Sequence, residues 1–224
     1  MQIKKAISRI SKILLLGILT LFLMSFTPIK YDKIFKKDKQ KVDTLIMIMP
    51  YVQVFAHDNE EVFMDIELSI LNENLIDSVS KDILDRKYVF KNITLKPDAL
   101  GLSDLFEKLE ASPKYLNNIS AQNIFMKQEI IWESKYAIMI FLEGYHLAAY
   151  PPHYFRNAQL KSNTIMIPIN NSTESEIDLR LIMINTESNE IVYYDKVNSS
   201  QYDPRLPNEI ENMVRQILKK IYYK

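Results

Sequence analysis

The sequence predicts an α+β fold: a mixed sheet of three to five strands with helices mainly on one face, and a C-terminal hairpin followed by a helix. Three segments carry this prediction. Residues 136–142 form an unbroken β-prone run, residues 177–197 alternate in polarity on both sides of a turn, and residues 207–221 repeat apolar side chains at helical spacing. Elements with one apolar face must stack against each other, so these segments belong to one layered domain.

Residues 1–26 differ in composition from everything that follows. Lys and Arg side chains precede an apolar run at residues 13–26, ILLLGILTLFLMSF. A helix of these 14 residues is roughly 21 Å long, whereas the hydrocarbon of a bilayer is roughly 30 Å thick. The run therefore predicts a signal peptide, and a protein exported to the periplasm or cell envelope. The alternative, which the sequence leaves open, is a short uncleaved membrane anchor at residues 13–26.

Residues 27–41 are rich in lysine and predict a solvated basic linker. Residues 1–41 contain ten Lys or Arg and two Asp, a net charge of +8, and residues 42–224 carry −8 because the whole chain is neutral. Contact with a membrane is therefore expected only through residues 1–41. Residues 42–224 are expected to form a single α+β domain. Because this part of the chain is acidic, we expect it to repel nucleic acid.

The first half of this domain predicts two strands and two helices. Residues 42–55 are rich in β-forming side chains, and Pro50 interrupts their hydrogen-bonding ladder. Apolar side chains at helical spacing over residues 68–83 predict a helix that begins at Asp65 or Ser69. A strand over residues 87–95 and a short helix over residues 99–110 follow.

The second half predicts one helix, the remaining strands and a closing helix. We expect a helix over 119–132, a central strand over 135–150, a loop over 153–163 and an edge strand with Pro168 over 164–169. The alternation over residues 177–197, with turn residues at Thr186–Asn189, indicates a β-hairpin. The last helix begins near Pro204 or Pro207, and Asp203 is its candidate N-cap.

The chain has no cysteine, three glycines and three histidines, and these counts limit its chemistry. They exclude disulfides, thiolate metal sites, lipidation at a lipobox and a glycine-rich phosphate loop. Glu143 and His146 lie three residues apart, so on a strand they face opposite sides. A zinc site that combines His146 with His153 is the remaining metal alternative. We expect no catalytic residue, no metal site and no cofactor.

Aromatic side chains gather beside two prolines in residues 144–155, GYHLAAYPPHYF. Such a patch is typical of a surface that binds a protein or a glycan. The predicted partner-binding residues are Tyr145, Tyr150, His153, Tyr154 and Phe155. One alternative is a loop whose aromatic rings fold back onto the core. Another is an exported enzyme of hydrolase type that uses this loop.

Two stretches also resemble a known family. TLIMIMPYVQVF, residues 44–55, has a proline near the end of its strand, and LRLIMINTESNEIVYYDKV, residues 179–197, precedes the helical NEIENMVRQILKKIYY. Both are similar to the bacterial envelope α/β domains of the curli secretion channel subunit, the TolB N-terminal domain and related small outer-membrane lipoproteins. The lipobox cysteine of the lipoprotein members is missing. The resemblance implies a non-enzymatic binding or assembly accessory role in the envelope, with an envelope protein or a glycan as partner, and the sequence leaves the oligomeric state open.

Overall fold

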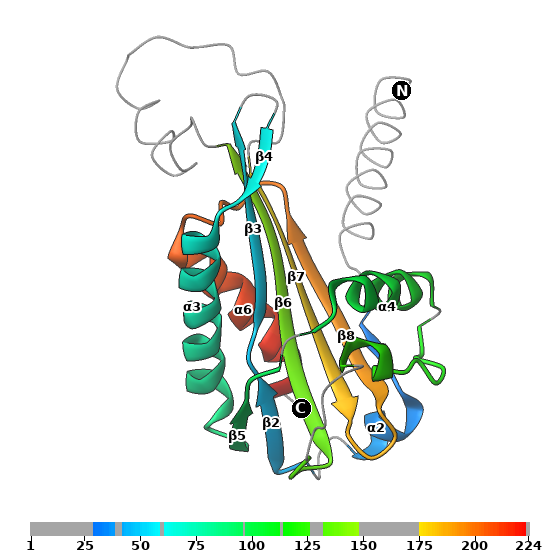
Figure 1. Cartoon of the computed structure of the whole chain (residues 1–224). Coiled ribbons are helices and arrows are strands. Elements are labelled where there is room, and N and C mark those ends of the chain that lie inside the picture. Colours follow the sequence, from blue (N-terminus) through cyan, green and yellow to red (C-terminus); the bar gives the residue numbers. More distant parts are fainter. Residues whose placement is uncertain are drawn as a thin grey trace, which may run out of the picture.

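The computed structural model describes residues 29–38, 42–58, 61–95, 97–112, 114–125, 132–147 and 175–222. Its centre is an eight-stranded mixed sheet (Figure 1). The strands are β1 (Lys30–Tyr31), β2 (Thr44–Ile48), β3 (Tyr51–Asp58), β4 (Glu61–Met64), β5 (Val89–Ile93), β6 (Tyr136–Leu147), β7 (Ser175–Asn185) and β8 (Glu190–Ser199).

Strand β6 organises the sheet because it is long enough to pair with two strands along one edge. Its first half lies parallel to β2, and its second half lies parallel to β3 from Tyr51 to His57. The interruption between β2 and β3 falls at Pro50, as the sequence predicts. The other edge of β6 pairs with β7, and β7 forms the expected antiparallel hairpin with β8.

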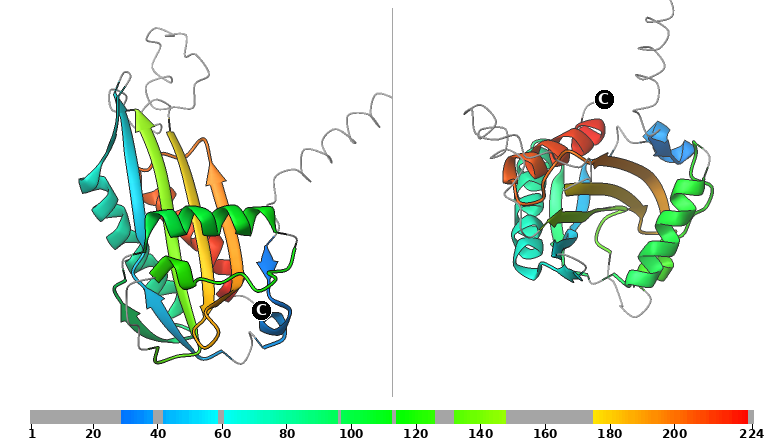
Figure 2. Two further views of the ribbon diagram at one scale, coloured as in Figure 1. Left: turned by 45° about the vertical axis from the view of Figure 1, so that its right-hand side comes forward. Right: turned by 90° about the horizontal axis from the view of Figure 1, so that it is seen from above.

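Helices cover both faces of the sheet (Figure 2). The helices α3 (Ile66–Leu84) and α6 (Pro207–Tyr222) pack on one face and share a core with alternate residues of β2, β3, β6 and β7. The helix α4 (Ala99–Ala111) and the 3₁₀ turn η2 (Gln122–Phe125) lie on the other face, over a second and smaller core. Figure 2 shows that α4 crosses this second face and that no described helix covers the upper part of it.

The predicted fold class is confirmed, and two of its details change. The described sheet has eight strands, more than the three to five expected. Pro50 splits one expected strand into β2 and β3, and the sequence did not predict β1 and β4 because they are too short to show a periodic pattern. The long helices α3 and α6 lie on one face as expected, but α4 lies on the opposite face. Of the two expected starting points for α3, Asp65 and Ser69, the helix uses Asp65 as its N-cap. The Asp65 side chain accepts a hydrogen bond from the Leu68 amide.

The expected solvated linker is instead partly folded. Within residues 27–41, β1 pairs with β8, and residues Lys33–Asp38 form the helix α2. The Phe35 ring is buried between Tyr136 and Tyr193, at centroid distances of 5.3 and 6.5 Å. The Lys30 ammonium donates hydrogen bonds to the carbonyl groups of Leu109, Glu110 and Ser112 at the end of α4. The sequence predicts a solvated segment because it contains six lysines, and this composition gives no sign that Lys30 and Phe35 are buried.

Two further expectations are wrong where they can be followed. Of the helix expected over 119–132, residues 126–131 lie outside the described residues. The described part before them forms only a 3₁₀ turn at Gln122–Phe125, because the preceding residues bond to the β7–β8 turn: the Ala121 amide donates to the Asn189 carbonyl, and the Ile119 carbonyl accepts from the Ile191 amide. Asp203 is not the N-cap of α6, which begins at Pro207; its carboxylate accepts instead from the backbone and side chain of Arg205.

The predicted signal peptide or anchor at 1–26, the loop at 153–163 and the strand at 164–169 lie outside the described residues. Among the helices that the structure does describe, none has both the length and the apolar character needed to span a bilayer.

Candidate functional site

The part of the sheet that α4 leaves uncovered is the candidate site, and we call it the open face. Alternation along the strands decides which side chains lie there. Val52 and Val54 of β3 pack into the core beneath α3 and α6, so the residues between and beyond them point to the other side. The open face consists of Gln53, Phe55 and His57 of β3, Glu143 and Tyr145 of β6, Glu176 and Asp178 of β7, and Asn198 of β8.

Strand register places these side chains in rows across the sheet. Gln53 lies opposite Glu143, and Glu143 lies opposite Asp178. In the next row Phe55 lies opposite Tyr145, which lies opposite Glu176. Directly opposed side chains on one sheet face are close enough to interact, so each row is a continuous strip of contacts.

A groove of about 510 Å³ runs where the open face meets α4. The helix contributes six residues to its wall, among them Leu102, Phe106, Glu107 and Glu110, and strands β3, β6 and β7 contribute the rest of the lining. This volume lies within the range of clefts that bind small molecules or a few side chains of a partner. The strands line the groove with Tyr51, Gln53, Phe141, Leu142, Glu143 and Arg180.

Arg180 lines the groove, and Lys196 of β8 lies beside it. The Arg180 guanidinium lies 2.5 Å from Asp178 and 3.4 Å from Glu110, and stacks over the Phe106 ring at 4.6 Å. The Lys196 ammonium lies 2.9 Å from Asp178 and 3.1 Å from Glu110. Both cations are therefore shared between the same two carboxylates, and the ring of Phe106 fixes the orientation of the guanidinium.

The cations act differently on the two carboxylates. Burial alone would raise the pKa of Glu110, but the hydrogen bond and charge of Lys196, together with Arg180, lower it below its ordinary value. Burial of Asp178 dominates over the opposing effect of Arg180 and Lys196, so its pKa is raised. Glu110 is thus held ionised at the groove, and Asp178 is the more deeply buried member of the network.

Aromatic rings line the outer part of the open face. The Tyr145 ring stacks on Phe55 at a centroid distance of 5.4 Å, and the His57 ring meets its edge at 5.6 Å. The Tyr145 hydroxyl donates a hydrogen bond to Glu143, and burial with this bond raises the pKa of Tyr145 to about 12. The ring is therefore held in one orientation by contacts on β3 and β6.

Of the predicted partner-binding residues, Tyr145 lies on the open face. Tyr150, His153, Tyr154 and Phe155 lie outside the described residues, as does the His153 half of the alternative zinc site. Sequence reasoning missed Phe55 and Glu143 as the contacts of Tyr145, and it missed Arg180 in the groove. The signal that could have found Arg180 is the pair of charges in IDLRLIM, which interrupts an otherwise apolar strand.

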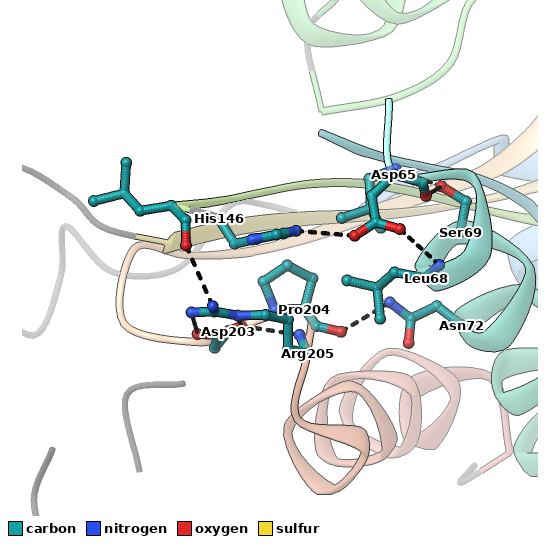
Figure 3. A network of polar contacts seen from close by, with 10 residues as sticks. Asp65, Leu68, Ser69, Asn72, His146, Asp203, Pro204 and Arg205 are labelled. Atoms are coloured by element: carbon teal, nitrogen blue, oxygen red, sulfur yellow. Dashed lines mark hydrogen bonds and ion pairs between the residues drawn. The ribbon is translucent and has the colours of Figure 1, made fainter. Parts of the chain in front are cut away.

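His146 directly follows Tyr145 on β6 and therefore lies on the opposite face of the strand. Its Nε2 lies 3.3 Å from a carboxylate oxygen of Asp65, the residue that caps α3. Nearby, Asn72 of α3 donates to the Pro204 carbonyl, and Arg205 donates to Leu147. The network in Figure 3 thus joins α3, β6 and the segment before α6.

This network does not resemble a hydrolytic triad, because the only hydroxyl beside Asp65 in it is already committed. The Ser69 hydroxyl donates to the Asp65 carbonyl and accepts from the Val54 amide. Throughout the described part of the chain, no three His, Cys, Asp or Glu side chains are grouped so that they could hold a metal ion.

Comparison with known proteins gives distant structural matches. No protein-family model matches the chain, and no curated protein matches its sequence. The PelC dodecamer from Paraburkholderia phytofirmans matches with a TM-score of 0.39 and 5% identity, covering 82% of this chain and 90% of that one. A putative neuraminyllactose-binding hemagglutinin homolog from Helicobacter pylori matches at 0.39 and 10%, over 80% and 81%.

The lipoprotein GNA1162 from Neisseria meningitidis matches at a TM-score of 0.30 and 7% identity, over 81% of this chain and 97% of that one. All three are bacterial proteins, and one is a lipoprotein by name. The resemblance to the curli secretion channel subunit and TolB is not confirmed by these matches. At such scores they establish neither a family nor a function for this chain.

Proposed function

We propose that this chain is a non-catalytic binding or assembly accessory protein of the bacterial cell envelope, and that it holds its partner on the open face and in the groove. One observation carries the proposal: the described helices leave part of a sheet face uncovered (Figure 2), and the side chains there form ordered aromatic and charged rows. A sheet face of this kind is normally buried against another layer of the fold. An uncovered one that adjoins a groove is the default candidate for a binding surface.

The state of the charged groups supports recognition rather than proton transfer. Arg180, Lys196, Asp178 and Glu110 neutralise one another at distances of 2.5–3.4 Å. Groups that satisfy each other in this way fix the shape of a surface. A general acid or base instead needs a group with a tuned pKa that also reaches a substrate, whereas Asp178, whose pKa is raised, is largely buried and engaged by both cations. The proposed location in the cell envelope rests on the predicted signal peptide, and mass spectrometry of the mature N-terminus tests it.

Site-specific photo-crosslinking in the native bacterium tests the binding surface. A photoreactive residue is placed at Tyr145 on the open face, and in a matched variant at Asn74, which is exposed on α3 on the other side of the sheet. We expect discrete adducts from position 145 and none from position 74. Absence of adducts at position 145, or equal adducts at both positions, contradicts the proposal.

A further inference from the structure

We infer that the partner presents a basic protein segment, with cationic and apolar side chains interspersed, to the groove between α4 and the open face. This inference rests on the proposed function and specifies the chemistry of its partner. It follows from how the charges of the groove are distributed in depth, from the composition of its walls and from the net charge of the domain.

The cations of the groove lie deep and the carboxylates lie at its rim. Only 16% of the Arg180 side chain and 17% of the Lys196 side chain are exposed, compared with 44% for Glu110 and 39% for Glu143. Glu107 is exposed on the same wall of α4, and Glu176 is exposed farther along the open face. An approaching partner therefore meets carboxylates first.

Arg180 and Lys196 both contact Glu110, and Arg180 also lies 3.8 Å from Glu143, but these two cations offset only part of the charge of the four carboxylates around them. Asp178 contacts both Arg180 and Lys196 within 2.9 Å, and its side chain is itself only 17% exposed. This trio leaves one positive charge at the floor against Glu107, Glu110 and Glu143 at the rim. The pKa of Glu110 is lowered mainly by Lys196 and Arg180, which oppose its burial, so that rim charge is present at neutral pH.

The walls of the groove between these charges are apolar or aromatic. Tyr51 and Phe141 contact edge to face at 6.5 Å, and Phe106 meets Phe141 at 5.0 Å. Leu102 of α4 completes this side of the lining. A segment that alternates Lys or Arg with apolar residues matches both features, because its cations reach the rim while its apolar side chains enter the groove.

The charge of the whole domain favours the same class of partner. Residues 29–224, which include the folded β1–α2 segment, carry a formal net charge of −4, and this charge attracts basic proteins over distances of about one Debye length, roughly 10 Å at moderate salt. Nucleic acid, anionic lipid and acidic glycans are repelled by it. A neutral glycan is neither attracted nor repelled, so it is the competing outcome in the experiment below.

Crosslinking from inside the groove identifies the chemistry of the partner. A photoreactive residue at Gln53, which lines the groove, is crosslinked in cells, and the attached fragment is identified by mass spectrometry. We expect a protein fragment with net positive charge in which Lys or Arg lies within a few residues of the crosslink. An acidic fragment or a glycan adduct overturns the inference. If position 145 still gives adducts while position 53 gives an acidic fragment or a glycan, the inference fails and the proposed function stands. If neither position gives adducts, the proposed function fails as well.

A binding measurement on the full-length chain provides the second test. The probe is a fluorescent peptide of about ten residues that alternates Lys with Val and Tyr, which spans roughly 30 Å when extended. In the double variant Glu107→Gln/Glu143→Gln we expect Kd to rise about tenfold, since two rim charges are lost. The matched double variant Glu61→Gln/Glu67→Gln removes the same charge from β4 and α3, and we expect Kd to change less than about twofold.

The same assay contains the results that would overturn the inference. Binding should weaken between about 50 mM and about 300 mM salt, because charge attraction is screened. A peptide with Glu in place of Lys should not bind. Equal binding of both peptides, an unchanged Kd in the rim variant, or rim-dependent binding of cellohexaose in place of the peptide each contradicts a basic protein segment as the occupant.

Discussion

At the scale of single residues, the buried carboxylate of Asp195 shows how one ion pair joins two elements. Asp195 is 1% exposed on β8, and the Lys220 ammonium of α6 reaches it at 2.8 Å. Burial raises the pKa of Asp195, and the hydrogen bond and charge of Lys220 oppose that shift. A buried charge that loses its partner is costly, so this pair makes the position of α6 on the sheet sensitive to a single side chain.

Replacing Lys220→Met is therefore expected to lower the free energy of unfolding by about 3 kcal/mol at neutral pH. A raised folded pKa means that the folded state holds the Asp195 proton more tightly than the unfolded state does. The free energy of unfolding consequently falls as pH rises from the ordinary pKa of an Asp toward the raised folded pKa of Asp195. Without Lys220, the folded pKa of Asp195 rises further. The cost of the substitution should thus be smaller at about pH 5 than at about pH 8.

Urea unfolding of both proteins at the two pH values measures this difference. The control is Arg215→Met, which breaks exposed pairs with Glu211 on the same helix and with Asp82 of α3 and should cost less than about 0.5 kcal/mol. Equal costs for the two substitutions, or a larger Lys220→Met cost at the lower pH, would contradict the described environment of Asp195.

At the scale of elements, the short β1–α2 unit decides whether residues 30–38 belong to the domain. Phe35 is 4% exposed and packs on Tyr136 and Tyr193, whereas its neighbour Ile34 is 70% exposed. We expect Phe35→Ala to lower the free energy of unfolding by about 3 kcal/mol, because it leaves a cavity in the core. We expect Ile34→Ala, the matched control one residue away, to change it by less than about 0.5 kcal/mol. Chemical denaturation measures both, and near-equal small effects would restore the solvated linker that the sequence predicts.

Elements with a strong local pattern could be predicted from the sequence, and elements fixed by tertiary contacts could not. The hairpin, β6 and α6 carry apolar side chains at regular spacing, and each lies where the sequence places it. By contrast, α2 is held by one buried ring, and the segment before η2 is held by hydrogen bonds to the β7–β8 turn. Neither contact leaves a periodic trace, so the composition of each segment was misleading.

The candidate site follows the same division. Tyr145 was predicted because aromatic residues cluster beside it in the sequence. Phe55 and Glu176 are its neighbours through strand register, which joins residues 90 and 31 positions away in the chain. Parallel pairing of β3 with β6 is decided by the whole sheet, so no local pattern of residues could assign Phe55 to the same row.

At the scale of the whole molecule, stability should fall from the centre of the sheet to its edges. β6 has a paired strand on each side and residues Tyr136–Leu142 are all buried. β4 pairs only with β3 among the described residues, and all four of its side chains are exposed. Local opening of β4 therefore exposes almost no new apolar surface, whereas opening of β6 disrupts both cores.

Hydrogen exchange of the native protein should reproduce this order. Amides of Ile138–Leu142 should exchange only by global unfolding, at rates that follow the denaturant dependence of the whole domain, whereas those of Val62–Met64 should exchange by local opening that denaturant scarcely affects. An exposed apolar edge is also the place where another strand can add. If β4 amides prove as protected as those of β6, then its outer edge is covered in solution, and the strand that covers it becomes a second contact surface beside the open face.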